Sequence, residues 1–346
     1  MSLAFHLAEN GYLPDSMLRS GIRKLCRDRL AKEGIDQPEL AEARYQELLG
    51  ELRASPLAIA TDQANEQHYE LPTEFFKTVL GPRLKYSSCF YSDDNNTLEQ
   101  AEIAALQQSC ERAQLADGQH ILELGCGWGS LTLWMAEHYP NAKITAVSNS
   151  KTQKLYIDAE AARRGFNHIN VITCDVNQLS LEANQFDRAV SIEMFEHVRN
   201  YQQLFANIST WLKPEGKLWC HIFTHRFLMY SFGDENEQNW MSKYFFTGGM
   251  MPSSDTFLNF QDDLNVEQRW LWSGQHYEKT ANHWLDNMDA HKDNLMPLFD
   301  EVYGKDASTW WQRWRLFFMS CAELFGLEKG CQWGVNHYRF TNHKTL

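Results

Sequence analysis

The amino-acid sequence predicts an α/β protein built around a doubly wound parallel sheet, with a helical N-terminal extension and one long insertion. Three observations support this fold class. Short β-rich apolar runs alternate with helical periods from residue 120 to residue 223, a glycine-rich loop follows the first run, and residues 226–277 break the alternation. Alternating strands and helices favour a parallel sheet covered by helices. The 346 residues suffice for one such core with additions.

Residues 1–100 are predicted to form the helical extension and a lid over the ligand site of the core. The segment Leu40–Leu49 repeats apolar residues at helical spacing. Pro72 is placed to open another helix. Thr97 and Gln100 have the spacing of a capping box, which predicts that an amphipathic helix begins there.

Residues 101–225 are predicted to form the Rossmann-like core. Five short apolar runs are candidate strands, and helical periods separate them. The turn residues Lys213–Gly216 precede the fifth run and indicate the end of a helix. The expected strands are His120–Leu124, Lys143–Val147, Asn170–Thr173, Asp187–Ile192 and Lys217–Phe223.

The C-terminal third is predicted to cap and then complete the core. Residues 226–277, which include the Gly- and Met-containing segment Phe245–Ser253, are interpreted as a substrate cap over the active site. Residues 278–346 are expected to return to the core, with an aromatic helix over 307–325 and a last strand near His337–Phe340. The dense aromatic cluster suits a pocket for an aromatic or cationic ligand, or a large core.

Charge and cysteine usage exclude several function classes. The formal net charge of −13 argues against a protein that tracks the phosphates of nucleic acid, and no apolar run approaches membrane-spanning length. The eight cysteines have no metal-ligand spacing, so we expect free thiols and no metal site. No basic segment followed by an apolar stretch opens the sequence, so we expect a cytoplasmic location.

The run Ile121–Gly129 predicts a cofactor-binding loop. Glycines at 125, 127 and 129 follow a strand and precede a helix, so the backbone can turn tightly and approach a ligand at the helix N-terminus. Ser130 stands where a dinucleotide fingerprint needs its third glycine, which makes hydride chemistry the weaker interpretation. The loop therefore predicts an S-adenosylmethionine-dependent enzyme with a class I methyltransferase fold.

Polar residues after the first three strands complete the predicted cofactor site. Glu123 is placed to meet the ammonium of the methionine moiety. Asp175 is placed to bind the adenine amino group, and a surface helix cap is its alternative role. Ser148 and Asn149 stand where many nucleoside-binding sheets carry an acid for the ribose hydroxyls, and Gln153 is expected to supply the missing hydrogen bonds.

The segment Ser191–His197 is predicted to carry the catalytic residues, because it follows the fourth strand at the edge where parallel sheets bind ligands. Glu193 can orient a cationic amine. His197, or Glu196 paired with it, can take the proton that the amine loses before its lone pair attacks a sulfonium methyl. In the alternative interpretation His197 is a core histidine and the glutamates begin a solvated helix. Their clustering beside a cofactor loop favours catalysis.

Motifs in a fixed order along the chain point to one superfamily. They are His68–Pro72, Leu84–Tyr91, Thr97–Glu102, Leu124–Ser130, Met194–Val198 and His276–Thr280. With them, the chain resembles the cyclopropane-fatty-acyl-phospholipid synthase superfamily, and more closely its coclaurine N-methyltransferase-like branch, whose members methylate benzylisoquinoline amines. The likeness extends over residues 60–342.

The resemblance extends the set of predicted site residues. Glu193, Glu196 and His197 are implied to bind substrate and remove its proton. The expected acceptor pocket contains His221, Phe245, Tyr277 and Trp314. The cofactor contacts, from the resemblance and from the residues discussed above, are Tyr69, Tyr86, Ser87, Glu123, Gly125, Gly127, Ser148, Asn149, Gln153, Asp175 and Val176.

The lipid-modifying members of the superfamily differ at the catalytic positions. They use a bound bicarbonate as base, held partly by a cysteine, an isoleucine and a histidine. This chain has Ser88 at the cysteine position and Phe223 at the isoleucine position, and Glu193 replaces a glycine usual in the lipid enzymes. These differences disfavour bicarbonate binding and favour methylation of an amine. The positions that the chain keeps are Glu196, His221 and Tyr277.

The leading hypothesis is therefore N-methylation of a small aromatic or alkaloid-like amine, with that amine as partner and a homodimer as a candidate assembly. The alternative is cyclopropanation or methylation of unsaturated fatty acyl chains of phospholipids. A hypothesis from another class is a non-catalytic cofactor-binding scaffold, which the retained acidic and histidine residues disfavour.

Overall fold

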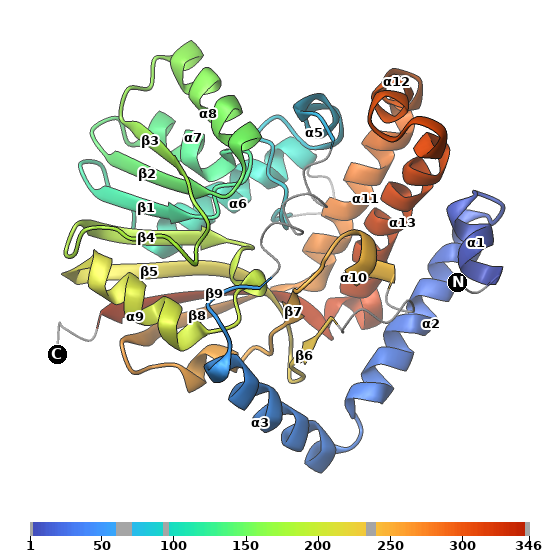
Figure 1. Cartoon of the computed structure of the whole chain (residues 1–346), viewed down its shortest axis with the longest axis horizontal. Coiled ribbons are helices and arrows are strands. Elements are labelled where there is room, and N and C mark those ends of the chain that lie inside the picture. The colour runs from blue at the N-terminus through green and yellow to red at the C-terminus, as the bar shows by residue number, and fades with distance from the viewer. Residues whose placement is uncertain (1–2, 60–70, 93–96, 233–239, 343–346) are drawn as a thin grey trace.

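The structure, a computed structural model, describes residues 3–59, 71–92, 97–232 and 240–342 (Figure 1). Its centre is a seven-stranded sheet in the order β3-β2-β1-β4-β5-β9-β8. The pairs from β3 to β5 are parallel, and β9 is antiparallel to both its neighbours. The strand order reverses at β1, which confirms the predicted doubly wound sheet. The strands are β1 (His120–Leu124), β2 (Lys143–Ser148), β3 (Ile169–Thr173), β4 (Phe186–Ile192), β5 (Leu212–His225), β8 (Leu264–Ser273) and β9 (Trp333–Asn342).

Helices cover both faces of the sheet. Neighbouring residues of a strand point to opposite sides, and apolar side chains on both sides must be buried. In β1, Ile121 packs with residues of α6 and α7, whereas Leu122 packs with residues of α3 and α9. Both side chains are fully buried, as expected for a strand covered on both faces. The first face carries α6 (Leu98–Ala113), α7 (Ser130–His138) and α8 (Lys151–Arg164), and the second carries α3 (Pro38–Ala54) and α9 (Tyr201–Trp211).

Two local helix signals in the sequence are confirmed. The backbone N–H of Gln100 donates to Thr97 Oγ1 (3.3 Å), and the backbone N–H of Thr97 donates to Gln100 Oε1 (3.0 Å), so a capping box opens α6. Pro72 directly precedes α5 (Thr73–Val79). Both signals depend on neighbouring residues alone, which explains why they could be read without the fold.

A second group of helices forms a layer beside the sheet (Figure 1). Its aromatic core contains Trp314, Phe317 and Phe318, all buried. Glu323 joins Arg19 (2.9 Å) and Arg23 (2.6 Å), and these ion pairs fasten the N-terminal extension to the layer. The helices are α1 (Leu3–Glu9), α2 (Asp15–Glu33), α11 (Gly274–Ala290), α12 (Lys292–Tyr303) and α13 (Ala307–Gly326).

Two predicted boundaries are corrected. Residues 264–273 of the expected cap form β8, the edge strand of the main sheet, so the described part of the cap is limited to short elements before it. The expected turn at 213–216 lies within the bounds of β5. There the pairing jumps from Phe186 with Leu212 to Arg188 with Lys217, so the turn residues bulge out of the ladder. The short elements are β6 (Tyr230–Ser231), α10 (Trp240–Tyr244), β7 (Met250–Met251) and the 3₁₀ helix η2 (Thr256–Asn259).

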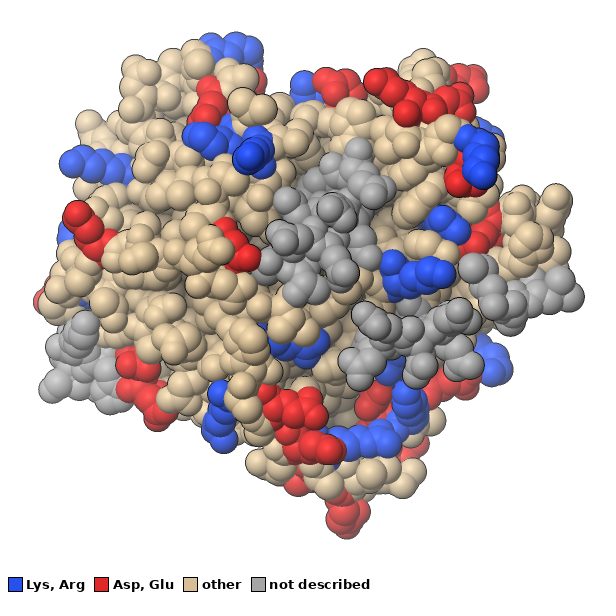
Figure 2. Space-filling model, viewed as in Figure 1, with Lys and Arg blue, Asp and Glu red and all other residues tan. Residues whose placement is uncertain are grey.

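Charged side chains of both signs are interspersed over the face drawn in Figure 2. Among the helices that the structure describes, none combines the length and the apolar character needed to cross a membrane.

Candidate active site

A cavity lies at the carboxyl ends of β1, β2 and β4, at the reversal of strand order where open sheets bind ligands. The glycine loop, the loop before α6 and the segment after α3 contribute to its wall. Tyr69 lies outside the described residues. The predicted site residues on the wall are Tyr86, Ser87, Glu123, Gly125, Gly127, Ser148, Asn149, Asp175, Val176, Glu193 and His197.

The glycine loop needs the backbone freedom of glycine, as Gly125 and Gly127 illustrate. Gly125 has φ +79°, and a Cβ there would lie 2.6 Å from the Cβ of Met194. Gly127 has φ +51°, and a Cβ there would meet nothing within 4 Å. Left-handed backbone costs other residues roughly 1–2 kcal/mol. The loop therefore packs closely against the residue after Glu193 while leaving open space beside Gly127.

Glu123 offers a buried carboxyl group to the cavity. Its Oε2 accepts a hydrogen bond from Thr132 Oγ1 at 2.5 Å, and the side chain is only 2% exposed. Burial raises the pKa of Glu123 to about 8, and the bond from Thr132 opposes this. A cationic group in the cavity favours the charged form of such a carboxyl. Glu123 therefore fits the ammonium of a methionine moiety.

Ser148 and Gln153 form a polar pair at the end of β2. Ser148 Oγ donates to Gln153 Oε1 at 2.6 Å. Gln153 is buried outside the cavity wall, and its Nε2 donates to none of the described residues. Buried polar groups normally have a partner. An open donor beside Ser148 therefore fits a hydroxyl-bearing ligand such as the ribose of the predicted cofactor.

Asp175 links the cavity to the N-terminal extension. Its Oδ1 accepts from the backbone N–H and the side-chain amide of Asn177, at 2.8 and 3.0 Å. The amide of Asn177 in turn binds the backbone N–H and carbonyl of Ala58, which lines the cavity with Ile59. The element that follows β3 is strand β4, so Asp175 does not cap a helix.

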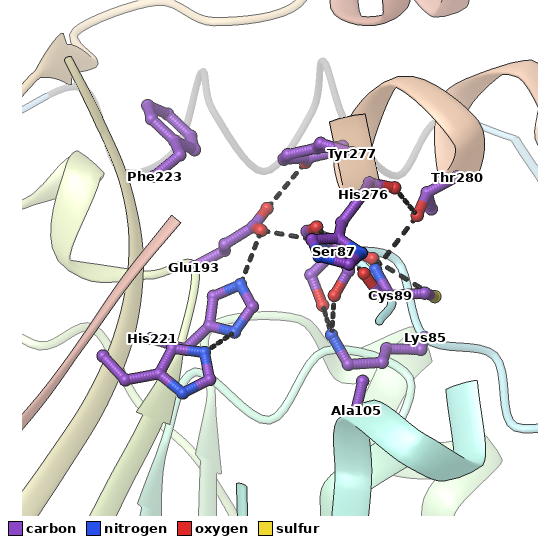
Figure 3. Close-up of polar contacts among 12 residues, drawn as sticks. Lys85, Ser87, Cys89, Ala105, Glu193, His221, Phe223, His276, Tyr277 and Thr280 are labelled. Atoms are coloured by element: carbon purple, nitrogen blue, oxygen red, sulfur yellow. Dashed lines mark hydrogen bonds and ion pairs between the residues drawn. The ribbon is translucent and has the colours of Figure 1, made fainter. Parts of the chain in front are cut away.

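Glu193 is held by three polar groups from three other parts of the fold (Figure 3). Its Oε1 accepts from the backbone N–H of Ser88 (3.0 Å) and lies 3.0 Å from His221 Nε2. Its Oε2 accepts from the hydroxyl of Tyr277 at 2.7 Å. The backbone φ of Glu193 is +45°, an uncommon value that surrounding contacts must maintain. Burial raises the pKa of Glu193, and the charge of Lys85 opposes this.

Glu196 is the more isolated of the two carboxyl groups. It is fully buried and lies outside the cavity wall, and its Oε1 accepts from the backbone N–H of Phe223 at 3.2 Å. Its Oε2 accepts from none of the described residues. Burial and the nearby charge of Glu193 raise the pKa of Glu196 well above its ordinary value. The predicted alternative of a solvated helix start is therefore wrong.

His197 faces the cavity with a neutral ring. The ring stacks on Phe246 with centroids 4.6 Å apart, and the residue lies on the cavity wall. Burial lowers the pKa of His197 to about 4, and the charge of Glu193 opposes this. At pH 7 the imidazole is uncharged, so it retains the capacity to accept a proton.

Lys85 and Glu102 are buried ionisable residues that the sequence did not reveal as part of the site. Lys85 Nζ donates to Ser87 Oγ and to the carbonyl of Ser88, both at 2.6 Å. Glu102 accepts from the backbone N–H groups of Arg83 (2.8 Å) and Lys85 (3.1 Å). This network fixes the loop that presents Ser88 to Glu193. Opposite charges in neighbouring motifs were the only signal, since nothing in the sequence indicated their burial.

The positions compared above with those of the lipid enzymes contact glutamate side chains in this structure. Ser88, His221 and Tyr277 all contact the carboxylate of Glu193, and Phe223 donates to Glu196. His221 and Tyr277 thus lie behind the wall as partners of Glu193.

Phe245 and Trp314 are not brought to the cavity. The ring of Phe245 stacks on Phe317 with centroids 4.5 Å apart, and Trp314 packs against Phe75 at 4.8 Å. Both residues are almost fully buried. Their aromatic cluster forms the large core that the sequence left open as an alternative to a pocket.

Comparisons with known proteins agree with this geometry. The family described as mycolic acid cyclopropane synthetase matches residues 58–333. The (S)-coclaurine N-methyltransferase of Thalictrum flavum subsp. glaucum is 35% identical over 337 residues, which cover 96% of this chain and 93% of that protein. The cyclopropane-fatty-acyl-phospholipid synthase of Escherichia coli (strain K12) is 33% identical over 240 residues, 69% of this chain and 59% of that protein.

A solved structure extends the likeness to three dimensions. The crystal structure of coclaurine N-methyltransferase bound to N-methylheliamine and SAH superposes with a TM-score of 0.93 and 36% identity, and the match covers 97% of this chain and 98% of that one. The predicted fold class and superfamily are confirmed. The chain belongs to the mycolic acid cyclopropane synthetase family and is an S-adenosylmethionine-dependent methyltransferase.

Proposed function

We propose that this enzyme transfers the methyl group of S-adenosylmethionine to the nitrogen of a small aromatic or alkaloid-like amine. The observation that carries the proposal is the position of Glu193, whose carboxylate stands on the same cavity wall as the glycine loop. A fixed carboxylate stabilises the positive charge that grows on nitrogen as the N–C bond forms. Similarity to the (S)-coclaurine N-methyltransferases over nearly the whole chain supports an alkaloid-like acceptor.

Groups on the cavity wall, and Gln153 directly behind it, fit the parts of the cofactor. Glu123 would hold the ammonium of the methionine moiety, Asp175 the adenine amino group, and Ser148 with Gln153 the ribose hydroxyls. When bound, the cofactor supplies an electrophilic sulfonium methyl group. The open space beside Gly127 leaves the loop backbone accessible to it.

Glu196 and His197 are proposed to assist the loss of a proton from the acceptor amine. An amine is protonated near neutral pH, and its nitrogen must lose a proton before its lone pair can attack. His197 faces the cavity and is neutral, so its ring can receive that proton. Burial and the neighbouring charge raise the pKa of Glu196, so its buried carboxyl favours the protonated form and His197 on the cavity wall is the group placed to receive the proton first. Glu193 would meanwhile hold the amine nitrogen in line with the sulfonium methyl group.

A mass-spectrometric assay tests this proposal. The purified enzyme is incubated with labelled S-adenosylmethionine and with primary, secondary and tertiary aromatic amines, including coclaurine and heliamine. We expect a gain of one labelled methyl on at least one amine. Unsaturated phospholipid vesicles serve as the lipid control. Labelled lipid without any labelled amine would overturn the proposal.

Modification of unsaturated acyl chains is the second candidate. Identity to the Escherichia coli cyclopropane-fatty-acyl-phospholipid synthase and the retained Glu196, His221 and Tyr277 favour it. The contacts of His221 and Tyr277 with Glu193 count against it, because those groups are then occupied by a side chain. Bicarbonate-dependent labelling of vesicles would support this candidate.

Two further expectations belong to the same proposal. We infer a cytoplasmic enzyme that assembles as a homodimer. Fractionation of cells that express the chain tests its location, and light scattering coupled to size-exclusion chromatography tests its assembly. Membrane-bound enzyme or a monomer at all concentrations would contradict these expectations.

A further inference from the structure

A line of hydrogen bonds runs from α6 through two buried histidines to Glu193. Arg112 Nη1 lies 2.7 Å from His337 Nδ1, and His337 Nε2 lies 3.1 Å from His221 Nδ1. His221 Nε2 then lies 3.0 Å from Glu193 Oε1, the contact drawn in Figure 3. His221 and His337 face each other on the paired strands β5 and β9 and are at most 1% exposed. No predicted role in the sequence included Arg112 or His337.

The guanidinium of Arg112 determines where the protons of this line lie. A guanidinium only donates, so His337 Nδ1 must accept and His337 must carry its proton on Nε2. That proton points at His221 Nδ1, which must accept in turn. His221 therefore carries its own proton on Nε2 and donates it to the carboxylate of Glu193. Both rings are neutral in this arrangement, in keeping with the burial that lowers the pKa of His221 and His337.

We propose that Arg112 and His337 are positioning residues for the acceptor site. They hold His221 in the tautomer that donates to Glu193, and thereby keep that carboxylate ionised and aimed into the cavity. This inference rests on the proposed function, because it gives Glu193 the task of meeting the acceptor amine. Without a donor at Nδ1 of His221, the ring can adopt the other tautomer and turn a lone pair toward a Glu193 oxygen.

Arg112 is itself fixed in place for this role. Its guanidinium lies 5.3 Å from the ring centroid of Trp270 and 5.5 Å from that of Trp272, and both contacts favour a cation. Burial lowers the pKa of Arg112 to about 10, which leaves it charged at neutral pH. The line thus begins at a permanent positive charge.

Other groups around Glu193 do not replace this line. Lys85 directs its Nζ to Ser87 and Ser88, and Tyr277 binds the other oxygen of Glu193. The oxygen beside His221 therefore depends on the histidine and on the backbone of Ser88. The titratable groups that interact with Glu193 among the described residues are Lys85, Cys89, Glu196, His197, His221, Tyr277 and Cys321.

A spectroscopic experiment tests the proton positions independently of any substrate. Nitrogen NMR of histidine-labelled enzyme distinguishes the two neutral tautomers and the charged ring. We expect His221 and His337 as neutral rings with the proton on Nε2 between pH 6 and pH 9. Arg112→Met is expected to give mixed tautomers at His337. A charged or Nδ1-protonated His221 in the unmodified enzyme would overturn the inference, whether or not an amine substrate exists.

Kinetics of two variants at position 337 test the effect on catalysis. In His337→Gln the side-chain oxygen can accept from Arg112 and the amide can donate to His221, whereas His337→Leu breaks the line. We expect kcat/KM for the amine to fall roughly 10- to 100-fold in His337→Leu and less than about threefold in His337→Gln. The acid limb of the pH profile should move to higher pH in His337→Leu only, because a lost donor raises the pKa of Glu193.

A matched arginine controls for damage to α6. Arg188 donates to the carbonyl oxygens of Ala113 and Gln114 at the same helix end, and its described hydrogen bonds do not reach the histidines. Arg112→Met should reproduce the kinetic loss of His337→Leu, while Arg188→Met should leave the pH profile unchanged. Affinity for S-adenosylmethionine should be retained in all variants. Equal losses in His337→Leu and His337→Gln would reduce the two histidines to a packing role and overturn the proposal.

Discussion

The two sides of the cavity are built in different ways. The cofactor side comes mainly from one strand, its glycine loop and the ends of neighbouring strands, so adjacent residues and backbone geometry form it. The acceptor side is assembled from distant parts of the chain. The contacts of Glu193 with Ser88 and Tyr277 join residues 105 and 84 positions apart. The cofactor side is thus a local structure, whereas the acceptor side exists only when the whole fold is formed.

The sharpest test of this division removes the two residues that are proposed to assist proton loss from the amine. Glu196→Ala combined with His197→Ala should lower methyl transfer at least about 10³-fold, because general base catalysis contributes this much. The affinity for S-adenosylmethionine should stay within about threefold, since the cofactor side is intact. Turnover assays and calorimetry measure the two quantities. Loss of cofactor binding would mean that these residues build the cofactor site instead.

Two glutamate-to-glutamine variants, one on each side of the cavity, sharpen the comparison. Glu193→Gln should lower kcat/KM for the amine about 10²-fold, because a neutral amide does not stabilise the growing charge on nitrogen. Glu123→Gln should instead weaken binding of S-adenosylmethionine by roughly tenfold, since a charge-assisted hydrogen bond is lost. Each variant serves as the control for the other. The division between the two sides is mistaken if their effects are reversed.

Gly125 is where the two sides touch, so a substitution there should damage both. In Gly125→Ala the new Cβ meets Met194 at 2.6 Å in addition to its unfavourable φ of +79°. Gly118→Ala is the matched control, because its φ is +81° and its Cβ meets nothing within 4 Å. Both should lose roughly 1–2 kcal/mol of stability from backbone strain. Only Gly125→Ala should also weaken cofactor binding and amine turnover, measured by calorimetry and initial rates.

The sequence was sufficient to predict the structure where short-range patterns determine it. The strand and loop at 120–129 and the capping box at Thr97 depend on neighbouring residues, and the structure confirms them. Glu193 and His197 of the segment predicted to be catalytic lie on the cavity wall, because that segment follows a strand at the ligand edge of the sheet. The edge strand β8 was missed, because its pairing partner β9 lies some 70 residues later in the chain and the segment follows short irregular elements.

The side-chain hydrogen-bond networks and the burial of the aromatic residues could not be predicted from the sequence. Nothing in the order of residues indicates that His337 contacts His221, since that contact depends on the register of β5 with β9. An aromatic cluster likewise has the same pattern in a core and in a pocket. This ambiguity led to the placement of Phe245 and Trp314 in the acceptor pocket, whereas both pack in the helical layer.

The core role of Trp314 predicts a stability effect without a kinetic one. Trp314→Phe should lower the free energy of unfolding by about 1–3 kcal/mol, because a buried ring system is shortened and leaves a cavity. KM values for cofactor and amine should be unchanged. Urea denaturation measures the effect on stability, and steady-state kinetics measures the effect on the KM values. A large rise in the KM of the amine with normal stability would return Trp314 to the acceptor pocket.

Glu196 makes a smaller and pH-dependent contribution to stability. Its pKa is raised in the folded protein, so folding favours its protonated form, and stability from this group is full below its ordinary pKa and declines as the pH rises. Glu196→Gln keeps an oxygen for Phe223 and removes the titration. Relative to the unmodified enzyme, the variant should therefore gain stability with increasing pH, by at most about 1.4 kcal/mol per pH unit above the ordinary pKa. Urea denaturation at pH 5.5 and pH 7.5 measures this difference. A difference that is constant or falls with pH would show that Glu196 is ionised in the folded enzyme at both values, and that its open oxygen has a charged partner.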